Sequence, residues 1–222
     1  MRSVDWGQFR DLMISGTTDT LYMVLLSAVF TLLIGLPVGV LLFLTRKGGL
    51  LPNPLISHLL NWVVNIGRAL PFVIMLIAVI PFTRLIVGTT LGSTAAVVPI
   101  TLGAFPFFSR IVESALNEVD RGRIEAVQSL GGNLWYIVSR VLLPEALPAL
   151  VSGVTLTIVM LIGFSAMAGV VGGGGLGDLA IRYGYQRFDN TLMAGTVIML
   201  LFLVLAIQKT GDIVVRSLAH RR

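Results

Sequence analysis

Residues able to perform covalent or metal chemistry are scarce in this sequence of 222 residues. There is no cysteine, which excludes a thiolate nucleophile, a thiolate metal site and a disulfide. The two histidines, His58 and His220, are too few and too far apart in sequence to suggest a metal site. The long apolar segments contain no paired carboxylates and no serine beside a base, so we expect no catalytic, cofactor or metal site in the chain.

One glycine-rich stretch satisfies a nucleotide-binding pattern. Gly172, Gly174 and Gly177 fit Gly-x-Gly-x-x-Gly, but they follow an apolar segment and no strand-helix-strand pattern surrounds them. We predict an outer glycine loop that allows close packing or lies next to another protein. The only lysines, Lys47 and Lys209, follow no phosphate-binding loop, so we expect no ATP-hydrolysing site in the chain.

The apolar segments that must position these residues dominate the composition. The chain is 55% hydrophobic and 12% charged, with a mean hydropathy of +0.91, which excludes a water-soluble globular protein. A membrane span needs roughly 20 apolar residues. We predict an all-α integral membrane protein with a single domain over residues 1–222. Its five spans are about Thr20–Thr45, Trp62–Thr83, Leu85–Ser109, Ala146–Gly177 and Asn190–Gln208.

Basic residues lie between these spans, so the net charge of +5 indicates membrane orientation and not a nucleic-acid partner. Five spans place the termini on opposite sides. One side carries 11 basic residues: Arg46, Lys47, Arg68, Arg110, Arg121, Arg123, Arg140, Lys209, Arg216, Arg221 and Arg222. The other carries five: Arg2, Arg10, Arg84, Arg182 and Arg187. The positive-inside rule predicts an external N-terminus and a cytoplasmic C-terminus.

Residues 110–145 form the one polar stretch long enough for structure of its own. Asp120 is a suitable N-cap for a helix of about ten residues that stops at Gly131 and Gly132. Asn133 can cap a second amphipathic run, which we expect Pro144 to end. Composition alone fits an interfacial loop as well as a docking element for another protein.

This stretch resembles the EAA signature of binding-protein-dependent ABC importer permeases: Glu-Ala-Ala, three residues, Gly, nine residues, an aliphatic residue, one residue, Leu-Pro. The matching residues are Glu125, Ala126, Val127, Gly131, Val141, Leu143 and Pro144. Val127 replaces the usual second alanine and Val141 the usual isoleucine. The resemblance implies a type I importer permease fold with a short cytoplasmic coupling helix that docks on an ATPase. The residues it assigns to coupling are Arg123, Glu125, Ala126, Gly131, Leu143 and Pro144.

Other stretches look like the membrane subunit of methionine importers, among them residues 68–72, 80–89, 141–148 and 163–167. The resemblance implies import of D- or L-methionine by a homodimer that works with two ATPase subunits and an external binding protein. ATP and magnesium would bind to the ATPase, and the location would be the bacterial inner membrane. Ser165 and Met167, in the fourth span, are candidates for lining the path or gating it, although a methionine filling a helix interface fits equally.

Three alternatives differ in class. A permease for another amino acid or small polar solute is the strongest, because coupling residues do not report the cargo. An ion-coupled secondary transporter should carry acidic residues within its spans or matching repeats, and neither is seen. An intramembrane enzyme lacks the paired reactive groups that it would need. Tyr183, Tyr185 and Phe188 fit an outer aromatic belt or a contact with a binding protein.

Overall fold

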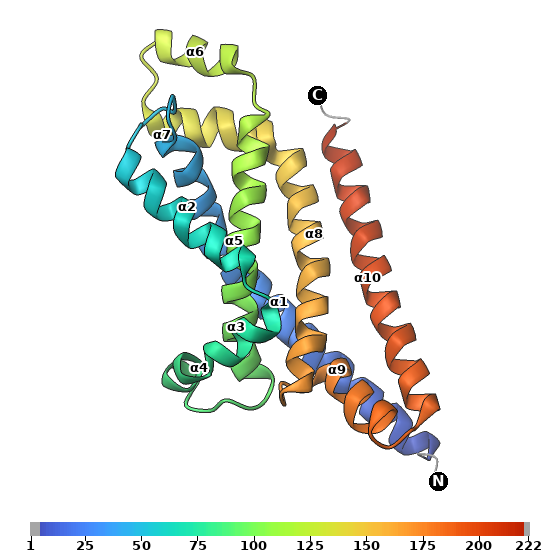
Figure 1. Ribbon diagram of the computed structural model, residues 1–222. Coiled ribbons are helices and arrows are strands. Elements are labelled where there is room, and N and C mark those ends of the chain that lie inside the picture. The colour runs from blue at the N-terminus through green and yellow to red at the C-terminus, as the bar shows by residue number, and fades with distance from the viewer. Residues whose placement is uncertain (1–4, 220–222) are drawn as a thin grey trace.

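The computed structural model describes residues 5–219 and is helical throughout its length, as predicted, with no strand in that range (Figure 1). Arg2, His220, Arg221 and Arg222, used above, lie outside the described residues. The α-helices are α1 (Trp6–Thr45), α2 (Pro54–Ala69), α3 (Phe72–Ala78), α4 (Ile80–Val87), α5 (Ser93–Asn117), α6 (Arg121–Ser129), α7 (Leu134–Tyr136), α8 (Leu143–Val170), α9 (Gly175–Leu179) and α10 (Asn190–Ala219). Two π-helical segments, η1 (Ile137–Leu142) and η2 (Ala180–Tyr185), precede α8 and follow α9.

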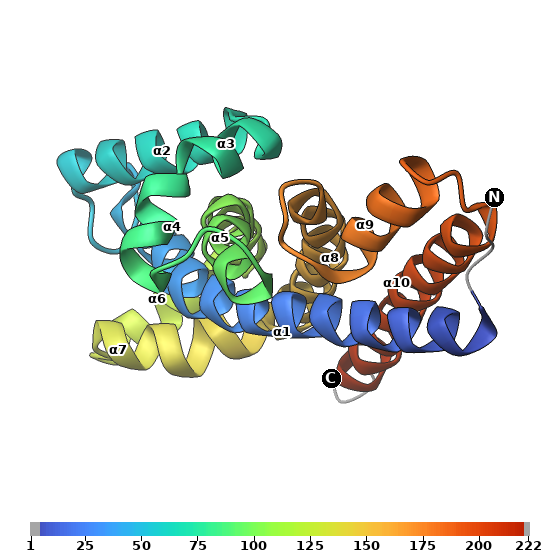
Figure 2. The same cartoon turned by 90° about the horizontal axis from the view of Figure 1, so that it is seen from below.

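Four described helices are long and apolar enough to cross a membrane: α1, α5, the continuous run Leu134–Val170, and α10. A fifth span exists if α2 and α3 are counted together. α1 crosses the molecule diagonally and packs chiefly on α5, while α8 packs between α5 and α10 (Figures 1 and 2). The expected number of spans therefore holds only with the bent pair included.

The second predicted span, Trp62–Thr83, is not one straight helix. α2 ends at Ala69, α3 begins at Phe72, and their axes differ by 108°. Leu70 is extended (φ −75°, ψ 128°) because a residue before proline avoids the helical region, and Pro71 has no N–H to continue the helix. Hydropathy remains high through the break, so only the proline marks it in the sequence.

Three other predicted boundaries also need correction. α1 begins at Trp6 and not near Thr20, because the Asp5 carboxylate accepts the Trp6 N–H (2.9 Å) and nothing in between ends the helix. The third span begins at Ser93, since α4 closes at Gly88, which adopts φ 81°. α5 also extends to Asn117, so the first part of residues 110–145 is helix and not loop.

Pro144 does not end the second amphipathic run. η1 leads directly into α8, and the Leu143 N–H donates to the carbonyl of Val138, five residues back. Proline is tolerated in the first turn of a helix, and the π-turn absorbs the register change before it. α8 then ends at Val170, earlier than the predicted Gly177, where Gly172 and Gly174 adopt positive φ.

Candidate ATPase-coupling site

α6 lies across one end of the molecule, the end that also carries the C-terminus, whereas the N-terminus and α9 lie at the opposite end (Figure 1). Its bounds follow from caps that the sequence predicted. The Asp120 carboxylate accepts the Gly122 N–H at 2.9 Å. At the other end Gly131 adopts φ 79°, and its N–H donates to the carbonyl of Gln128 at 2.9 Å.

The inner face of α6 is anchored in a hydrophobic core. Ile124 is buried and Val127 packs beside it. This core joins the ends of α1 and α5 to η1 and the start of α8, and includes Phe43, Leu44, Leu116, Val119, Ile137, Val138 and Leu142. Gly132 must lack a side chain because a Cβ atom there would collide with Val127. The helix therefore moves with the core and not independently of it.

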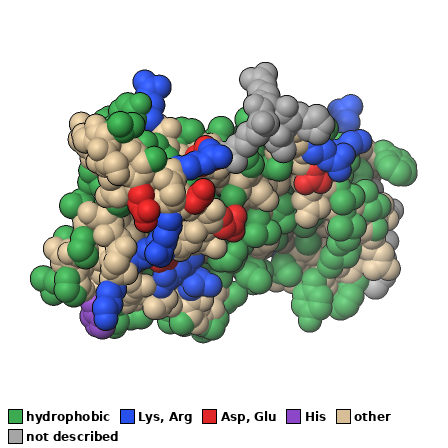
Figure 3. Space-filling view, turned by 90° about the horizontal axis from the view of Figure 1, so that it is seen from above, with side chains coloured by type: hydrophobic (Ala, Val, Ile, Leu, Met, Phe, Trp, Pro, Cys, Tyr) green, Lys and Arg blue, Asp and Glu red, His purple; other side chains and the backbone are tan. Residues whose placement is uncertain are grey.

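The outer face of α6 is exposed. Glu125, Ala126 and Gln128 lie open to the surroundings, and Leu130 just beyond is 87% exposed. Trp135, on α7, is 76% exposed. Figure 3 shows acidic and basic side chains gathered over this end of the molecule. An anchored helix with an acidic residue, a small residue and bulky apolar side chains on its free face is suited to docking on another protein.

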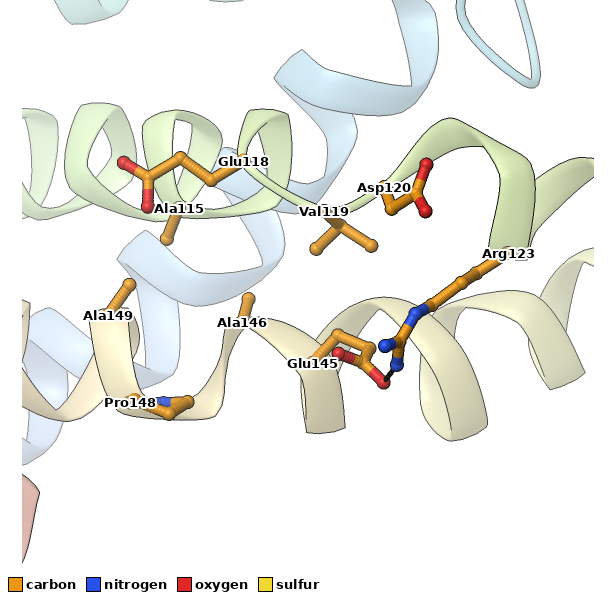
Figure 4. A pocket seen from close by; sticks show the side chains of 9 residues that line it. All are labelled: Ala115, Glu118, Val119, Asp120, Arg123, Glu145, Ala146, Pro148 and Ala149. Atoms are coloured by element: carbon orange, nitrogen blue, oxygen red, sulfur yellow. Dashed lines mark hydrogen bonds and ion pairs between the residues drawn. The ribbon is translucent and has the colours of Figure 1, made fainter. Parts of the chain in front are cut away.

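An ion pair links α6 to the start of α8. Arg123 pairs with Glu145, in the first turn of α8, across a cavity of about 310 Å³ (Figure 4). Glu118 and Asp120 also line this cavity. A second cavity, of about 230 Å³, separates α6 from the end of α1 and is lined by Arg46, among others. Partial burial is the main reason that the pKa of Arg46 is lowered, and repulsion from Arg121 lowers it further. Attraction to Glu113 offsets part of this shift.

The predicted coupling residues are not all on one surface. Arg123, Glu125 and Ala126 lie on α6 and Gly131 follows it. Leu143 instead packs against the core, and Pro144 is exposed in the first turn of α8. The last two support the core and the helix start, and Arg123 points toward α8. Glu125, Ala126 and Gly131 lie on or beside the exposed face.

The candidate gate residues lie far from this end, about 36 Å further along α8 at 1.5 Å per residue. Ser165 is buried and its hydroxyl donates to the carbonyl of Ile162 (2.8 Å), so it presents no free polar group. Met167 is 46% exposed. Of the two, Met167 has the accessible side chain.

The glycine loop packs helices together. Gly177 faces the backbone of Ala166, with which a Cβ atom would collide, and Gly172 accepts the Gly92 N–H at 2.9 Å. The Thr20 hydroxyl accepts the buried Leu176 N–H at 2.9 Å. The loop thus locks α9 against α1 and α8, in agreement with the close-packing interpretation. The hydrogen bond from Arg182 to Asp178 raises the pKa of Arg182.

The aromatic residues predicted beyond this loop lie at the same end. Tyr185 and Phe188 are largely exposed, and the Arg187 guanidinium lies 4.5 Å from the centre of the Tyr183 ring. Both earlier interpretations, a membrane belt and a protein contact, need exposed aromatic rings, so they remain open.

One polar network was missed from the sequence. Arg110 links α5 to α2 by hydrogen bonds to the side-chain oxygens of Asn61 (2.6 Å) and Asn65 (2.9 Å), and pairs with Glu113 (2.5 Å). The spacing of Asn61 and Asn65, four residues apart on one helix face, was the available signal. Arg68, counted above among the basic residues of one side, lies in the last turn of α2, just before the break.

Comparison with known proteins gives consistent matches. The profile of the family described as "Binding-protein-dependent transport system inner membrane component" matches residues 35–222. A "Probable D-methionine transport system permease protein MetI" from Vibrio cholerae is 53% identical over 95% of this chain and 94% of its own length. A "Methionine import system permease protein MetP" from Bacillus subtilis is 44% identical over 82% of each chain.

Solved structures agree with the sequence matches. A chain of the inward-facing "MetNI methionine ABC transporter" superposes with a TM-score of 0.94 at 46% identity, covering 97% of this chain and 99% of that one. An "amino acid ABC transporter with histidines" superposes with a TM-score of 0.79 at 20% identity, which shows a shared fold alone.

Proposed function

Because this chain belongs to the family of binding-protein-dependent transport system inner membrane components, we propose that it is the membrane-spanning permease subunit of an ATP-driven methionine importer. The observation that carries the proposal is the similarity to methionine permeases over nearly the whole chain. The permease is not an enzyme, and a separate ATPase subunit hydrolyses the ATP. It is a multi-pass protein of the inner membrane.

The proposed assembly contains two copies of this chain and two ATPase subunits, which bind ATP and magnesium, with an external protein that delivers D- or L-methionine. The methionine transporter of the same fold supports the permease dimer and the ATPase. Residues 1–222 act as one transmembrane domain embedded in the lipid bilayer. The binding protein would approach the end that carries the glycine loop, opposite α6.

We assign α6 as the helix that docks on the ATPase, with the N-terminus outside the cell and the C-terminus in the cytoplasm. The excess of basic residues on one side favours this orientation, and the termini lie at opposite ends (Figure 1). Glu125 offers a free carboxylate to a basic or amide partner, a contact worth about 1.5 to 3 kcal/mol when charge-assisted. Ala126 allows close approach, and Gly131 supplies the left-handed turn.

Movement of α6 would be passed to the transport path through the core and the Arg123–Glu145 pair. Met167 is the proposed gate, because its flexible apolar side chain is accessible on α8. Ser165, with its hydroxyl bonded within the helix, would support the packing beside it. Gly172, Gly174 and Gly177 hold the outer end of α8 in place.

The test is uptake of labelled methionine by proteoliposomes that contain this chain, its ATPase and its binding protein. We expect uptake that needs ATP and is blocked only by methionine and close analogues. Glu125→Lys should lower uptake while the complex still inserts, because the lysine opposes the proposed basic partner. Asp212→Lys, at an exposed aspartate on α10 and away from α6 and its cavities, is the matched control and should transport normally.

Each outcome bears on a different part of the proposal. ATP-dependent uptake of another solute in place of methionine would contradict the assigned cargo. Equal uptake with and without ATP would contradict the ATP-driven mechanism. Normal transport by the Glu125→Lys complex would remove α6 as the coupling helix.

A further inference from the structure

A cavity of about 370 Å³ lies beside the break between α2 and α3, separate from both α6 and the residues proposed as the gate. Its walls come from the end of α2, from α3, from the middle of α5 and from α8. In Figure 2, α3 lies above α5 and α8 lies beside it. Ligand pockets in proteins span roughly 300 to 1,000 Å³, so the space suits one small molecule.

One end of the cavity is apolar and rich in sulfur and aromatic rings. A Cβ atom built on Gly103 would lie 2.8 Å from the Met75 Cε atom and about as close to two phenylalanine rings. Those rings, Phe72 of α3 and Phe164 of α8, stack with centroids 4.0 Å apart. Met160 completes this end. Thioether and aromatic side chains adapt well to a flexible thioether or aliphatic chain.

The other end carries a single charge. The Arg68 side chain lines the cavity and is exposed, and among residues 5–219 it makes no hydrogen bond or ion pair. A charged residue within membrane-spanning segments is costly and therefore marks a functional site by default. Its guanidinium has the fork of donors that fits a carboxylate.

The helix break adds hydrogen-bond acceptors at this charged end. Because Pro71 has no N–H, the carbonyl of Gly67 has no donor four residues ahead. Gly67 also lines the cavity. Interrupted backbone at membrane depth is tolerated where it lines a water-filled cavity or is buried in protein. The carbonyl of Gly67 can accept a hydrogen bond from an ammonium group.

We propose that this cavity is a transient binding site for a zwitterionic amino acid with an apolar side chain on its way across the membrane. Arg68 binds the carboxylate, the carbonyl of Gly67 accepts from the ammonium, and the side chain of the ligand lies against Phe164, Met75 and Met160. The inference rests on the proposed function and adds to it the site within the permease at which the amino acid binds.

The experiment uses the full complex of this chain with its ATPase in lipid nanodiscs and a diazirine analogue of methionine as photoreactive probe. After irradiation, label is mapped by mass spectrometry on peptides of this chain alone. We expect label within residues 68–75 and 160–164. Methionine should block the labelling. Methioninamide, which lacks the carboxylate, should need a concentration at least about tenfold higher to block it, as expected for the loss of a charge-assisted hydrogen bond.

Arg68→Gln should abolish this preference for the carboxylate, and Arg68→Lys should retain part of it. Arg84→Gln, at an exposed arginine on α4 outside the cavity, is the matched control and should behave as the unaltered chain does. ATP hydrolysis by each complex checks that it has assembled. If Arg68→Gln fails to assemble, the location of the label and the methioninamide comparison in the unaltered complex decide the question.

Label confined to other segments, or equal competition by methionine and methioninamide in the unaltered complex, would overturn the proposal. So would an Arg68→Gln complex that keeps the full preference for the carboxylate. These outcomes can be distinguished from failure of the proposed function, because proteoliposomes that contain the unaltered chain would still import methionine when ATP is supplied.

Discussion

Replacing Arg110 by methionine should be among the most destabilising single changes in the chain. The substitution keeps a long side chain but removes the guanidinium that joins α5 to α2 through Asn61 and Asn65. It also leaves Glu113, whose side chain is only 15% exposed, without its ion-pair partner. The loss therefore combines missing hydrogen bonds with an unpaired, mostly buried carboxylate.

The magnitude follows from this environment. Removing one partner of a buried ion pair costs about 3 to 5 kcal/mol, because the remaining charge is uncompensated. We use the lower limit, about 3 kcal/mol, because the Arg110 side chain retains 24% exposure. At about 2 to 4 °C per kcal/mol for a chain of this size, the Tm should fall by about 6 to 12 °C.

The assay is thermal unfolding of the purified chain in detergent, followed by tryptophan fluorescence. The double variant Arg110→Met with Glu113→Met should recover much of the loss, since no charge is then left buried. The control is Arg10→Met, because Arg10 pairs with Asp11 in an exposed position where such pairs are worth about 1 kcal/mol or less. If Arg110→Met lowers the Tm no more than Arg10→Met does, the network is not a stabilising one.

Two further variants test the packing and the link between the ends of the molecule. Gly177→Ala places a Cβ atom against the Ala166 backbone and should lower the Tm sharply. The control Gly163→Ala, whose Cβ atom meets open space, should be neutral or slightly stabilising. Similar Tm values for the two variants would contradict the packing role of Gly177. Arg123→Glu should lower the amount of methionine imported per ATP hydrolysed, because it breaks the ion pair with Glu145. The double variant Arg123→Glu with Glu145→Arg should restore part of this ratio. If it restores none, the ion pair does not couple α6 to α8.

The sequence predicted local features well. Asp120 and Gly131 bracket α6, because capping depends on residues within one turn of each end. Pro71 itself is the sequence signal for the break after α2, whereas average hydropathy records composition and not helix continuity and does not reveal it. Arg68 was counted only as one of the basic residues of one side, and the structure places it on the wall of a cavity beside the break.

Long-range pairs were out of reach of the sequence. Arg110 and Asn61 are 49 residues apart, and only the packing of α5 on α2 brings them together. Pro144 shows the converse limit. Its usual effect is to end a helix, but η1 lets the backbone continue, and a π-turn leaves no local sequence pattern that we could have used.

The continuity of the run Leu134–Val170 explains how one end can affect the other. It is 37 residues long, or about 55 Å when followed along its bent axis at 1.5 Å per residue, and carries Glu145 near α6 as well as Phe164 at the cavity (Figure 1). The opposite wall of the cavity, α3, is separated from α2 by the break. The core that anchors α6 includes the start of α8, whereas no residue of α3 belongs to it, so a displacement of α6 should change the stacking of Phe164 on Phe72.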